Sequence, residues 1–173
     1  LSNKDFGISG KLAIIAHDLA SKNFQKQISA SGALNCLDAE AIEPLVETWK
    51  EMINGPTPEI RISSEQIIDA LGNIGPAAIN GLIKIIQIGD WPARKRAIQA
   101  LGRIGDNRAI DTLLHALKDK NGYVRREAVN ALGSFGNTQT VDALINALEE
   151  NPSEFLKETQ NWIRQEIIEA LGK

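Results

Sequence analysis

Few side chains in this sequence could carry out covalent chemistry, and they are not grouped. His17 and His115 are its two histidines, and Cys36 is its one cysteine. No histidine lies near Cys36, and the histidines are about three predicted helix pairs apart, so no nucleophile meets an activating base. Gly72 and Gly75 are not followed by the Lys-Ser/Thr of a phosphate loop. We expect no catalytic residue, no metal site and no resident cofactor.

Basic side chains offer the stronger binding chemistry. Arg94, Lys95 and Arg96 stand at the start of a predicted helix, where cations oppose the helix dipole. Arg125 and Arg126 occupy the corresponding place one repeat later. Guanidinium and ammonium groups bind carboxylate and phosphate, and departures from a local rule often mark function. These five residues form a predicted basic patch for an acidic partner.

The repeated arginine also has a structural interpretation. Arg94 and Arg125 share their position with Arg164 of the next repeat. A guanidinium there could bridge neighbouring repeats by pairing with acids such as Asp106 or Asp119. The sequence leaves both interpretations open.

Tryptophans divide into one that could face a partner and two that should not. Trp91 stands beside Pro92 at a predicted junction between repeats, as an exposed anchor or as part of the packing there. Trp49 and Trp162 fall on apolar stripes, and we expect both in the core.

Charge is segregated along the chain, although its formal total is only -3. Residues 38–59 hold six acids and one base, residues 91–126 nine bases and three acids, and residues 137–169 seven acids and two bases. In a repeat protein, blocks of sequence become blocks of surface, so a basic middle between acidic ends is predicted. The acidic ends and the pI of about 5.5 argue against nucleic acid as a partner.

Composition favours a folded protein of a reducing compartment. With 43% hydrophobic and 24% charged residues, the chain is too apolar for disorder. One cysteine excludes an internal disulfide framework, and the apolar runs fall short of the roughly 20 residues of a membrane span. We expect a cytoplasmic protein. Because the sequence begins at Leu1 rather than Met, we also expect a fragment of a longer chain.

A repeated phrase reveals the elements that position these residues. Ala-Leu-Gly-x-(Ile/Phe)-Gly occurs at residues 70–75, 100–105 and 131–136, and begins again at residue 170. Self-similarity at a period of roughly 30 residues is typical of stacked units that need a neighbour to bury their apolar face. Apolar stripes of helical period predict a pair of helices in each unit. The predicted repeats are 24–53, 58–88, 90–118, 121–149 and an incomplete 153–173.

Helix boundaries follow from the same pattern. Asp90 and Asn121 are predicted N-caps, and Pro92 suits a first helical turn. The last glycine of each phrase should end the first helix of its pair in a left-handed conformation. These glycines are Gly75, Gly105 and Gly136. An inner glycine costs about 1 kcal/mol within a helix, which suggests close approach by the second helix of each pair. The inner glycines are Gly72, Gly102 and Gly133.

The stretch from Val124 to Gly133, with sequence VRREAVNALG, resembles the short HEAT-like repeats of the bilin-lyase type. The namesakes of this family attach phycobilins to phycobiliproteins. The resemblance runs from about residue 24 to the end and is strongest over residues 90–148. The family carries an arginine early in the first helix, matched here by Arg94, Arg125 and Arg164, whereas Ser64 departs from it. It implies an all-α, right-handed α-α superhelix, a HEAT-like solenoid of about ten helices in about five repeats. We expect one domain over residues 1–173.

In this family the second helices line the concave surface, which yields a predicted partner-binding face. Its exposed residues are Glu43, Glu47, Asn80, Lys84, Asp111, His115, Asp142 and Asn146. Between them runs a column of short side chains, which are Pro44, Gly81, Thr112 and Ala143. The short column could floor a groove for a peptide or ligand, or could relieve crowding on a curved inner face.

The function that these features predict is a non-catalytic scaffold, which binds another protein through its concave face and basic patch. The family resemblance implies an alternative, a subunit of a phycobilin lyase or a phycobiliprotein-handling factor. In that case a linear tetrapyrrole would place its propionates against Arg94, Lys95 or Arg126. A regulatory or sensor arm of a multidomain protein is a third possibility.

The end of the sequence carries a predicted apolar face at Ile163, Ile167 and Leu171. An apolar face without a second helix implies a missing downstream helix, a partner or self-association.

Overall fold

The computed structural model describes residues 8–19, 23–34, 36–37, 39–53, 58–136, 138–150, 161–165 and 167–168. Within these residues all regular structure is helical, which confirms the predicted all-α class. None of the described helices combines the length and apolarity that a membrane span requires. The chain divides into two compact units, Leu1–Ile85 (unit 1) and Ile86–Lys173 (unit 2), and each is described by itself. The expectation of one domain stays a prediction.

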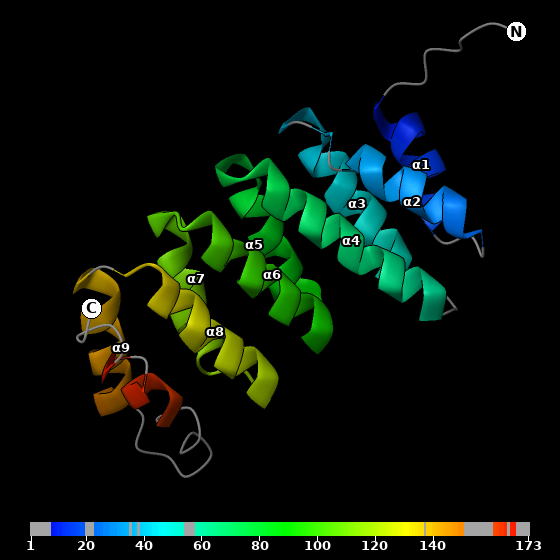
Figure 1. Ribbon diagram of the computed structural model, residues 1–173. Helices are drawn as coiled ribbons and strands as arrows, with labels where there is room; N and C mark the ends of the chain where they lie inside the picture. The colour runs from blue at the N-terminus through cyan, green and yellow to red at the C-terminus, as the bar shows by residue number, and fades with distance from the viewer. Residues whose placement is uncertain are drawn as a thin grey trace, which may run out of the picture. The chain divides into compact units, whose positions relative to one another are not determined.

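Unit 1 is built of helices packed around a buried apolar core, and Figure 1 shows its helices from blue to green. Its elements are α1 (Ile8–Leu19), α2 (Phe24–Leu34), the short 3-10 helix η1 (Ala39–Ala41), α3 (Ile42–Ile53), α4 (Pro58–Ile74), the 3-10 helix η2 (Pro76–Ala78) and most of α5 (Ile79–Ile88). Helix α1 packs on α2 and α3, and α4 packs on both α2 and α3. Trp49 is fully buried here, as predicted.

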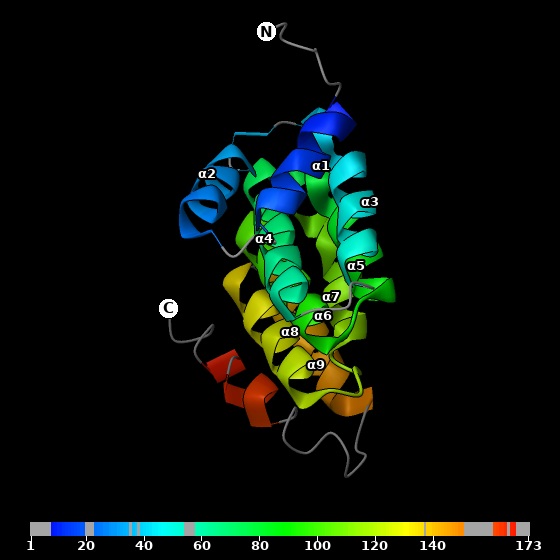
Figure 2. The same cartoon turned by 90° about the vertical axis from the view of Figure 1, so that its right-hand side faces the viewer.

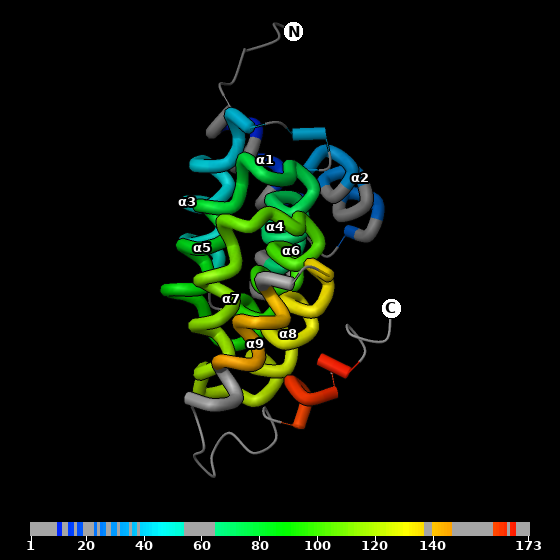
Figure 3. The backbone as a smooth tube through the Cα atoms, turned by 90° about the vertical axis from the view of Figure 1, so that its left-hand side faces the viewer, coloured from blue at the N-terminus to red at the C-terminus, as the bar shows by residue number. Residues whose placement is uncertain are grey.

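Unit 2 places consecutive first helices side by side. Its elements are α6 (Trp91–Ile104), the 3-10 helix η3 (Asn107–Ala109), α7 (Ile110–Ala116), α8 (Gly122–Ser134), α9 (Thr138–Glu150) and the helical residues 161–165 and 167–168. Helices α6 and α8 are in contact along their length (Figure 2). Helix α7 packs on α8 and α9, and Figure 3 shows α9 beside α8. The predicted pairs 90–118 and 121–149 correspond to α6 with α7 and to α8 with α9.

The predicted starts of α6 and α8 are confirmed. The Asp90 carboxylate accepts a hydrogen bond from the Ala93 N–H at 3.2 Å, with Pro92 in the first turn. The Asn121 side chain accepts one from the Tyr123 N–H at 2.9 Å. Each cap satisfies a helix donor that would otherwise lack a partner.

The predicted glycine stops are confirmed as well. Gly75, Gly105 and Gly136 have positive φ of 86°, 66° and 58°, which other residues rarely adopt. Gly105, with ψ of 22°, has the predicted left-handed helical conformation, whereas Gly75, with ψ of −144°, does not. At Gly105 the backbone N–H donates to the carbonyl of Leu101, which closes the end of α6.

The inner glycine of α6 corrects one prediction. A Cβ on Gly102 would lie 2.8 Å from Ala131 Cβ and 3.0 Å from Ala131 Cα. Ala131 belongs to α8, the first helix of the next repeat, so the close neighbour is not the second helix of the same pair. Consecutive first helices are neighbours in this layer, and two small residues let their backbones approach.

Apolar exposure near the end of the chain also differs from the prediction. Ile163 is only 2% exposed, so the expected exposed face is wrong at this residue. The neighbouring Trp162 contacts α8, because the guanidinium carbon of Arg126 lies 5.8 Å from the centre of the Trp162 ring. Ile167 is half-buried, and Leu171 lies outside the described residues.

On α9, two consecutive apolar residues differ in exposure, because Ile145 is 37% exposed whereas Leu144 is buried. Leu144 is buried on the side of α9 that packs on α7 and α8. Ile145 is the next residue and points about 100° further round the helix.

Candidate functional site

In unit 1 the predicted partner-binding residues project from α3 and α5. Glu43 and Glu47 on α3 and Asn80 on α5 are exposed, whereas Lys84 is half-buried. Lys84 Nζ lies 2.5 Å from Glu43 Oε1. The hydrogen bond from Lys84, together with its charge, lowers the pKa of the Glu43 carboxyl. Glu47 pairs instead with Lys50, at 2.6 Å. The structure therefore brings together Glu43 and Lys84, which come from adjacent second helices.

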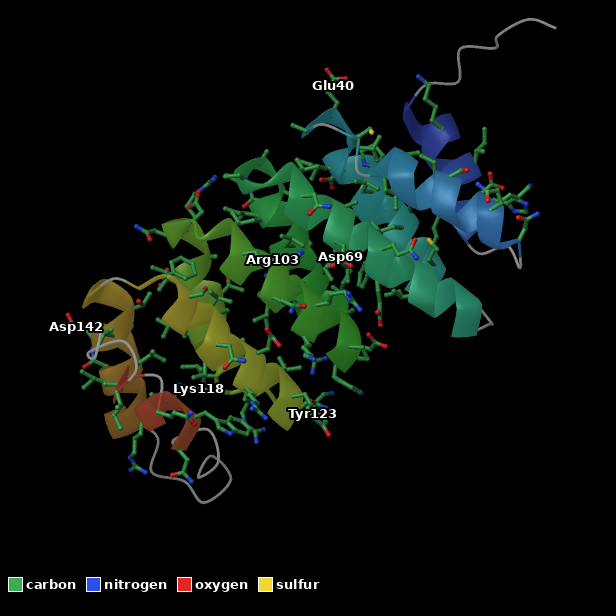
Figure 4. All side chains as sticks on the ribbon, viewed as in Figure 1. Glu40, Asp69, Arg103, Lys118, Tyr123 and Asp142 are labelled. Carbon is green, nitrogen blue, oxygen red and sulfur yellow. The ribbon has the colours of Figure 1, made fainter. Side chains whose placement is uncertain are left out.

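In unit 2 the corresponding residues project from α7 and α9. Asp111, His115, Asp142 and Asn146 are all exposed. Helix α7 contacts α9, and Figure 4 labels Asp142 on α9. Each unit thus carries its own part of what we call the second-helix surface: Glu43, Glu47, Asn80 and Lys84 in unit 1, and these four residues in unit 2.

Gly81 corrects the idea of a floor of short side chains. It is buried, and a Cβ there would lie 3.1 Å from Val46 Cγ2 and 3.3 Å from Ile42 Cγ2. Gly81 is therefore small because α5 packs closely on α3, and at this position it floors no groove. The other short residues of this column, Pro44, Thr112 and Ala143, are half-buried. They therefore lie partly at the surface and partly between helices.

Arg94 of the predicted basic patch is bound within the fold. Its Nε and Nη2 donate to the Asp119 carboxylate at 2.7 Å and 2.8 Å, and its Nη1 donates to the Gly89 carbonyl at 3.0 Å. The Arg94 and Asp119 side chains are only 12% and 13% exposed. The structural interpretation of the repeated arginine, with Asp119 as its acid, is confirmed at Arg94.

Asp119 is held by several groups at once. Burial by itself would raise the pKa of its carboxyl. Hydrogen bonds from Arg94 and from the Asn121 N–H, with the charges of Arg94 and Lys120, more than offset burial and lower that pKa. The carboxylate thus stays charged and keeps the start of α8 in place.

Arg125 completes this network. It is 5% exposed, and its Nη1 donates to the carbonyl of Asp119 at 2.9 Å. Arg94, Asp119 and Arg125 together are called the arginine staple, because they fasten the turn before α6 to the turn before α8. Arg164 has a different neighbour, with its Nη1 3.4 Å from the Asn161 side-chain oxygen.

The rest of the patch is available at the surface to different degrees. Arg126 is exposed, and its guanidinium carbon lies 5.8 Å from the centre of the Trp162 ring, a cation–π contact. Lys95 and Arg96 are half-buried. A partner for this patch stays a prediction.

Trp91 is both exposed and packed against the next repeat. It is 43% exposed, and its ring is stacked on that of Tyr123 with centres 5.5 Å apart and planes at 27°. Tyr123 is 66% exposed and projects from the start of α8 (Figure 4). Sequence reasoning missed Tyr123. The available signal was its place at the start of a first helix, one repeat after Trp91.

Catalytic residue types are dispersed in the structure. His17 and Cys36 in unit 1 and His115 in unit 2 are all exposed. Within the described ranges, no three or more His, Cys, Asp or Glu side chains gather as ligands of a metal ion. The absence of catalysis and the tetrapyrrole alternative both stay predictions.

Paired helices with glycine stops, stacked through like helices of successive pairs, define an α-solenoid repeat protein. The sequence pattern of HEAT repeats matches residues 46–122, 79–160 and 110–173. These matches cover more than half of the chain, and the chain belongs to the HEAT repeat family. Its bilin-lyase subtype stays a resemblance.

Solved structures with a similar fold are distant in sequence. A human deoxyhypusine hydroxylase in complex with glycerol is 15% identical, with 94% of this chain and 97% of that chain covered and a TM-score of 0.49. An archaeal HEAT-like repeats protein from Thermococcus onnurineus NA1 is 13% identical, with 92% and 73% covered and a TM-score of 0.47. A designed armadillo repeat protein in complex with the peptide (KR)4 is 20% identical, with 90% and 86% covered and a TM-score of 0.44. No curated protein matches the sequence significantly.

Proposed function

We propose that this protein is a non-catalytic scaffold that binds another polypeptide through its second-helix surface and the exposed part of its basic patch. One observation carries the proposal. Second helices bury one apolar face and present polar side chains at repeated positions, such as Glu43 on α3 and Asn80 on α5 in unit 1. A HEAT repeat protein offers such regularly spaced contacts to a partner that lies across several repeats.

The chemistry of this surface suits a partner with polar groups of both kinds. Asp111 and Asp142 accept hydrogen bonds, Asn146 both donates and accepts, and all three are exposed. The side chains of the Lys84–Glu43 pair are 45% and 61% exposed, so exchanging this pair for contacts with a partner costs little. Because Gly81 is buried against α3, a partner has no slot to enter at that position.

The basic patch contributes through fewer residues than its sequence suggests. Arg94 and Arg125 hold the turns in place and are largely buried. Lys95 and Arg126 remain as the cations that a partner can approach with least cost to the fold. A partner with carboxylates would pair with them at the rim of the contact.

Alanine replacement of Asp111, His115, Asp142 and Asn146 tests the second-helix surface. The matched control replaces Gln99 and Asn130, two exposed residues of the first helices α6 and α8. We expect the surface variant to lose most capture of the principal protein that the wild type retains from a cell extract. The control variant should keep that capture, and both should retain the wild-type circular dichroism.

Equal capture by the surface variant and the wild type would contradict the proposal. Charge reversal at Lys95 and Arg126, compared with Lys26→Glu on α2, tests the basic patch separately. An unchanged dissociation constant for the captured protein would remove the patch from the function.

A further inference from the structure

Two exposed aromatic rings stand on a rigid edge of unit 2. Trp91 begins α6, and Tyr123 lies in the first turn of α8. The arginine staple fixes the backbone on both sides, because Arg94 binds the Gly89 carbonyl and the Asp119 carboxylate. The aromatic pair is therefore held in place by groups other than itself, and a ligand would not have to order it.

Packing between repeats covers only part of the surface of the two rings. Stacking covers one face of each ring, but Trp91 remains 43% exposed and Tyr123 66% exposed. Ile88, at the end of α5, adds a third large apolar side chain at 52% exposure. Tryptophan and tyrosine with one covered and one open face are the side chains that most often anchor a partner.

Cations surround the rings. Lys95 follows Trp91 by four residues and Arg126 follows Tyr123 by three, so each shares a helix face with its ring. Lys120 is exposed in the turn before α8. The guanidinium of Arg126 is also positioned, since it lies over the Trp162 ring at 5.8 Å.

Two of the nearby acids are already engaged, while a third, Glu127, follows Tyr123 by four residues and is half-buried. Asp90 accepts the capping hydrogen bond of α6, and Asp119 is neutralised by Arg94. The surface that an incoming segment meets is therefore apolar at its centre and positive at its margin. We call Trp91, Tyr123, Lys95, Lys120 and Arg126 the aromatic edge.

We infer that the aromatic edge docks an acidic polypeptide segment that carries a large apolar side chain. The apolar side chain packs on the open faces of Trp91 and Tyr123, while flanking carboxylates pair with Lys95, Lys120 and Arg126. The inference rests on the proposed scaffold function only in taking the ligand to be a polypeptide. It adds a surface separate from the second-helix surface and names the chemistry of what binds there.

Charge arrangement favours this segment over a nucleic acid strand. Bases also stack on aromatic rings, but a strand brings a phosphate with every nucleotide. The aromatic edge offers three separate cations, Lys95, Lys120 and Arg126, rather than a continuous basic stripe, and the whole chain has a pI of about 5.5. Carboxylates of a peptide can be spaced to meet these separate cations.

Selection from a random peptide library displayed on phage tests the inference with the whole chain as bait. We expect enriched peptides in which aspartate and glutamate flank a leucine, phenylalanine or tryptophan. The best of these, synthesised with a fluorescein label, should lose about tenfold in affinity with Tyr123→Ala and also with Lys120→Glu. Tyr123→Phe keeps the ring and should bind almost as the wild type does.

Several outcomes would overturn the inference. They are the enrichment of no peptide, enrichment of basic or uncharged peptides, unchanged binding by Tyr123→Ala, and displacement of the labelled peptide by equimolar oligothymidine. The His115→Ala and Asp142→Ala pair is the control, and it should leave peptide binding unchanged. If those two substitutions abolish partner capture while Tyr123→Ala changes nothing, the scaffold function stands and the aromatic edge fails. If Tyr123→Ala abolishes peptide binding while His115→Ala and Asp142→Ala leave partner capture unchanged, the aromatic edge stands and the second-helix surface is rejected.

Discussion

Asp119 shows how one carboxylate can hold two helix starts. It receives two hydrogen bonds from Arg94, at 2.7 Å and 2.8 Å, and one from the Asn121 N–H at 2.8 Å. The backbone carbonyl of the same residue accepts from Arg125 at 2.9 Å. Because the side chains of Arg94 and Asp119 are nearly covered, their hydrogen bonds compete with little water, and losing one partner leaves the other unsatisfied.

Replacement of Asp119 by Asn should therefore lower the free energy of unfolding by about 2 kcal/mol near neutral pH. The pH dependence follows from the lowered pKa of Asp119. A pKa lower in the folded state than in the unfolded state stabilises the protein above the ordinary Asp pKa of about 3.9, and this stabilisation is lost as pH falls through the folded value. Urea unfolding at several pH values should show a shallower acid decline in Asp119→Asn. Parallel curves for the two proteins would contradict this account.

Two helical glycines make a matched pair with opposite expected outcomes. Gly102 on α6 has Ala131 so close that a Cβ would lie 2.8 Å from its Cβ and 3.0 Å from its Cα, whereas Gly32 on α2 has nothing within 4 Å. We expect Gly32→Ala to stabilise the protein by about 0.5–1 kcal/mol, through helix propensity. Gly102→Ala should destabilise it by about 1–2 kcal/mol, because overpacking outweighs that gain. Thermal unfolding measures both, and stabilisation by Gly102→Ala would show that α6 and α8 can separate at no cost.

At the scale of elements, the short helix η3 begins with a local electrostatic pair. Asp106 caps this helix by accepting from the Arg108 N–H at 2.9 Å, and it also accepts from the Arg108 guanidinium. The side-chain hydrogen bond first, then the backbone one, lower the pKa of Asp106 to about 2. The helix start is therefore stabilised above the ordinary Asp pKa and loses that support only as pH falls toward the lowered value.

Carboxyl-carbon NMR should record this titration directly. We expect Asp106 to titrate near pH 2 in the wild type. With Arg108→Gln its pKa should move toward the ordinary Asp value of about 3.9. Titration of the wild-type carboxyl near that ordinary value would contradict the pairing.

Helix ends could be predicted from the sequence because their causes are local. Asp90 and Asn121 act as caps through donors two or three residues away, and the positive-φ glycines are evident in the repeated phrase itself. The sequence predicted that another helix comes close to Gly102. The predicted neighbour, the second helix of the same pair, is wrong, because the close residue belongs to α8. Which helix of a stack comes nearest is decided by packing between repeats, and no spacing within one repeat encodes it.

The candidate site was predictable to a smaller extent for a similar reason. Arg94 pairs with Asp119 from far along the chain, and the sequence could offer this only as one of two possibilities. Tyr123 was missed because a polar aromatic residue at the start of a helix does not belong to a periodic apolar stripe. Only the fold shows that its ring stacks on Trp91.

At the scale of the whole molecule, two compact units imply stability that is local. Helix packing in a repeat protein involves near neighbours, so free energy is a sum of repeat and interface terms rather than one global quantity. Gly102 and Ala131 both lie in unit 2. A change at their contact should first loosen the helices that make it.

Hydrogen exchange followed by mass spectrometry can locate that loosening. In Gly102→Ala we expect amide protection to fall in α6 and α8, while α3 and α4 of unit 1 keep protection close to that of the wild type. Exchange that rises equally in all helices would mean that the chain unfolds as one cooperative block.

The arginine staple also bears on how this protein could be divided into interchangeable modules. A cut in the turn at residues 117–121 would separate one helix pair from the next. Such a cut would part Asp119 from either Arg94 or Arg125, and the orphaned guanidinium would be left against carbonyls that have moved away. In designed arrays with more or fewer repeats, α6, α7, this turn and the first turns of α8 should instead be kept together as one module. The boundary between modules should then lie further along α8.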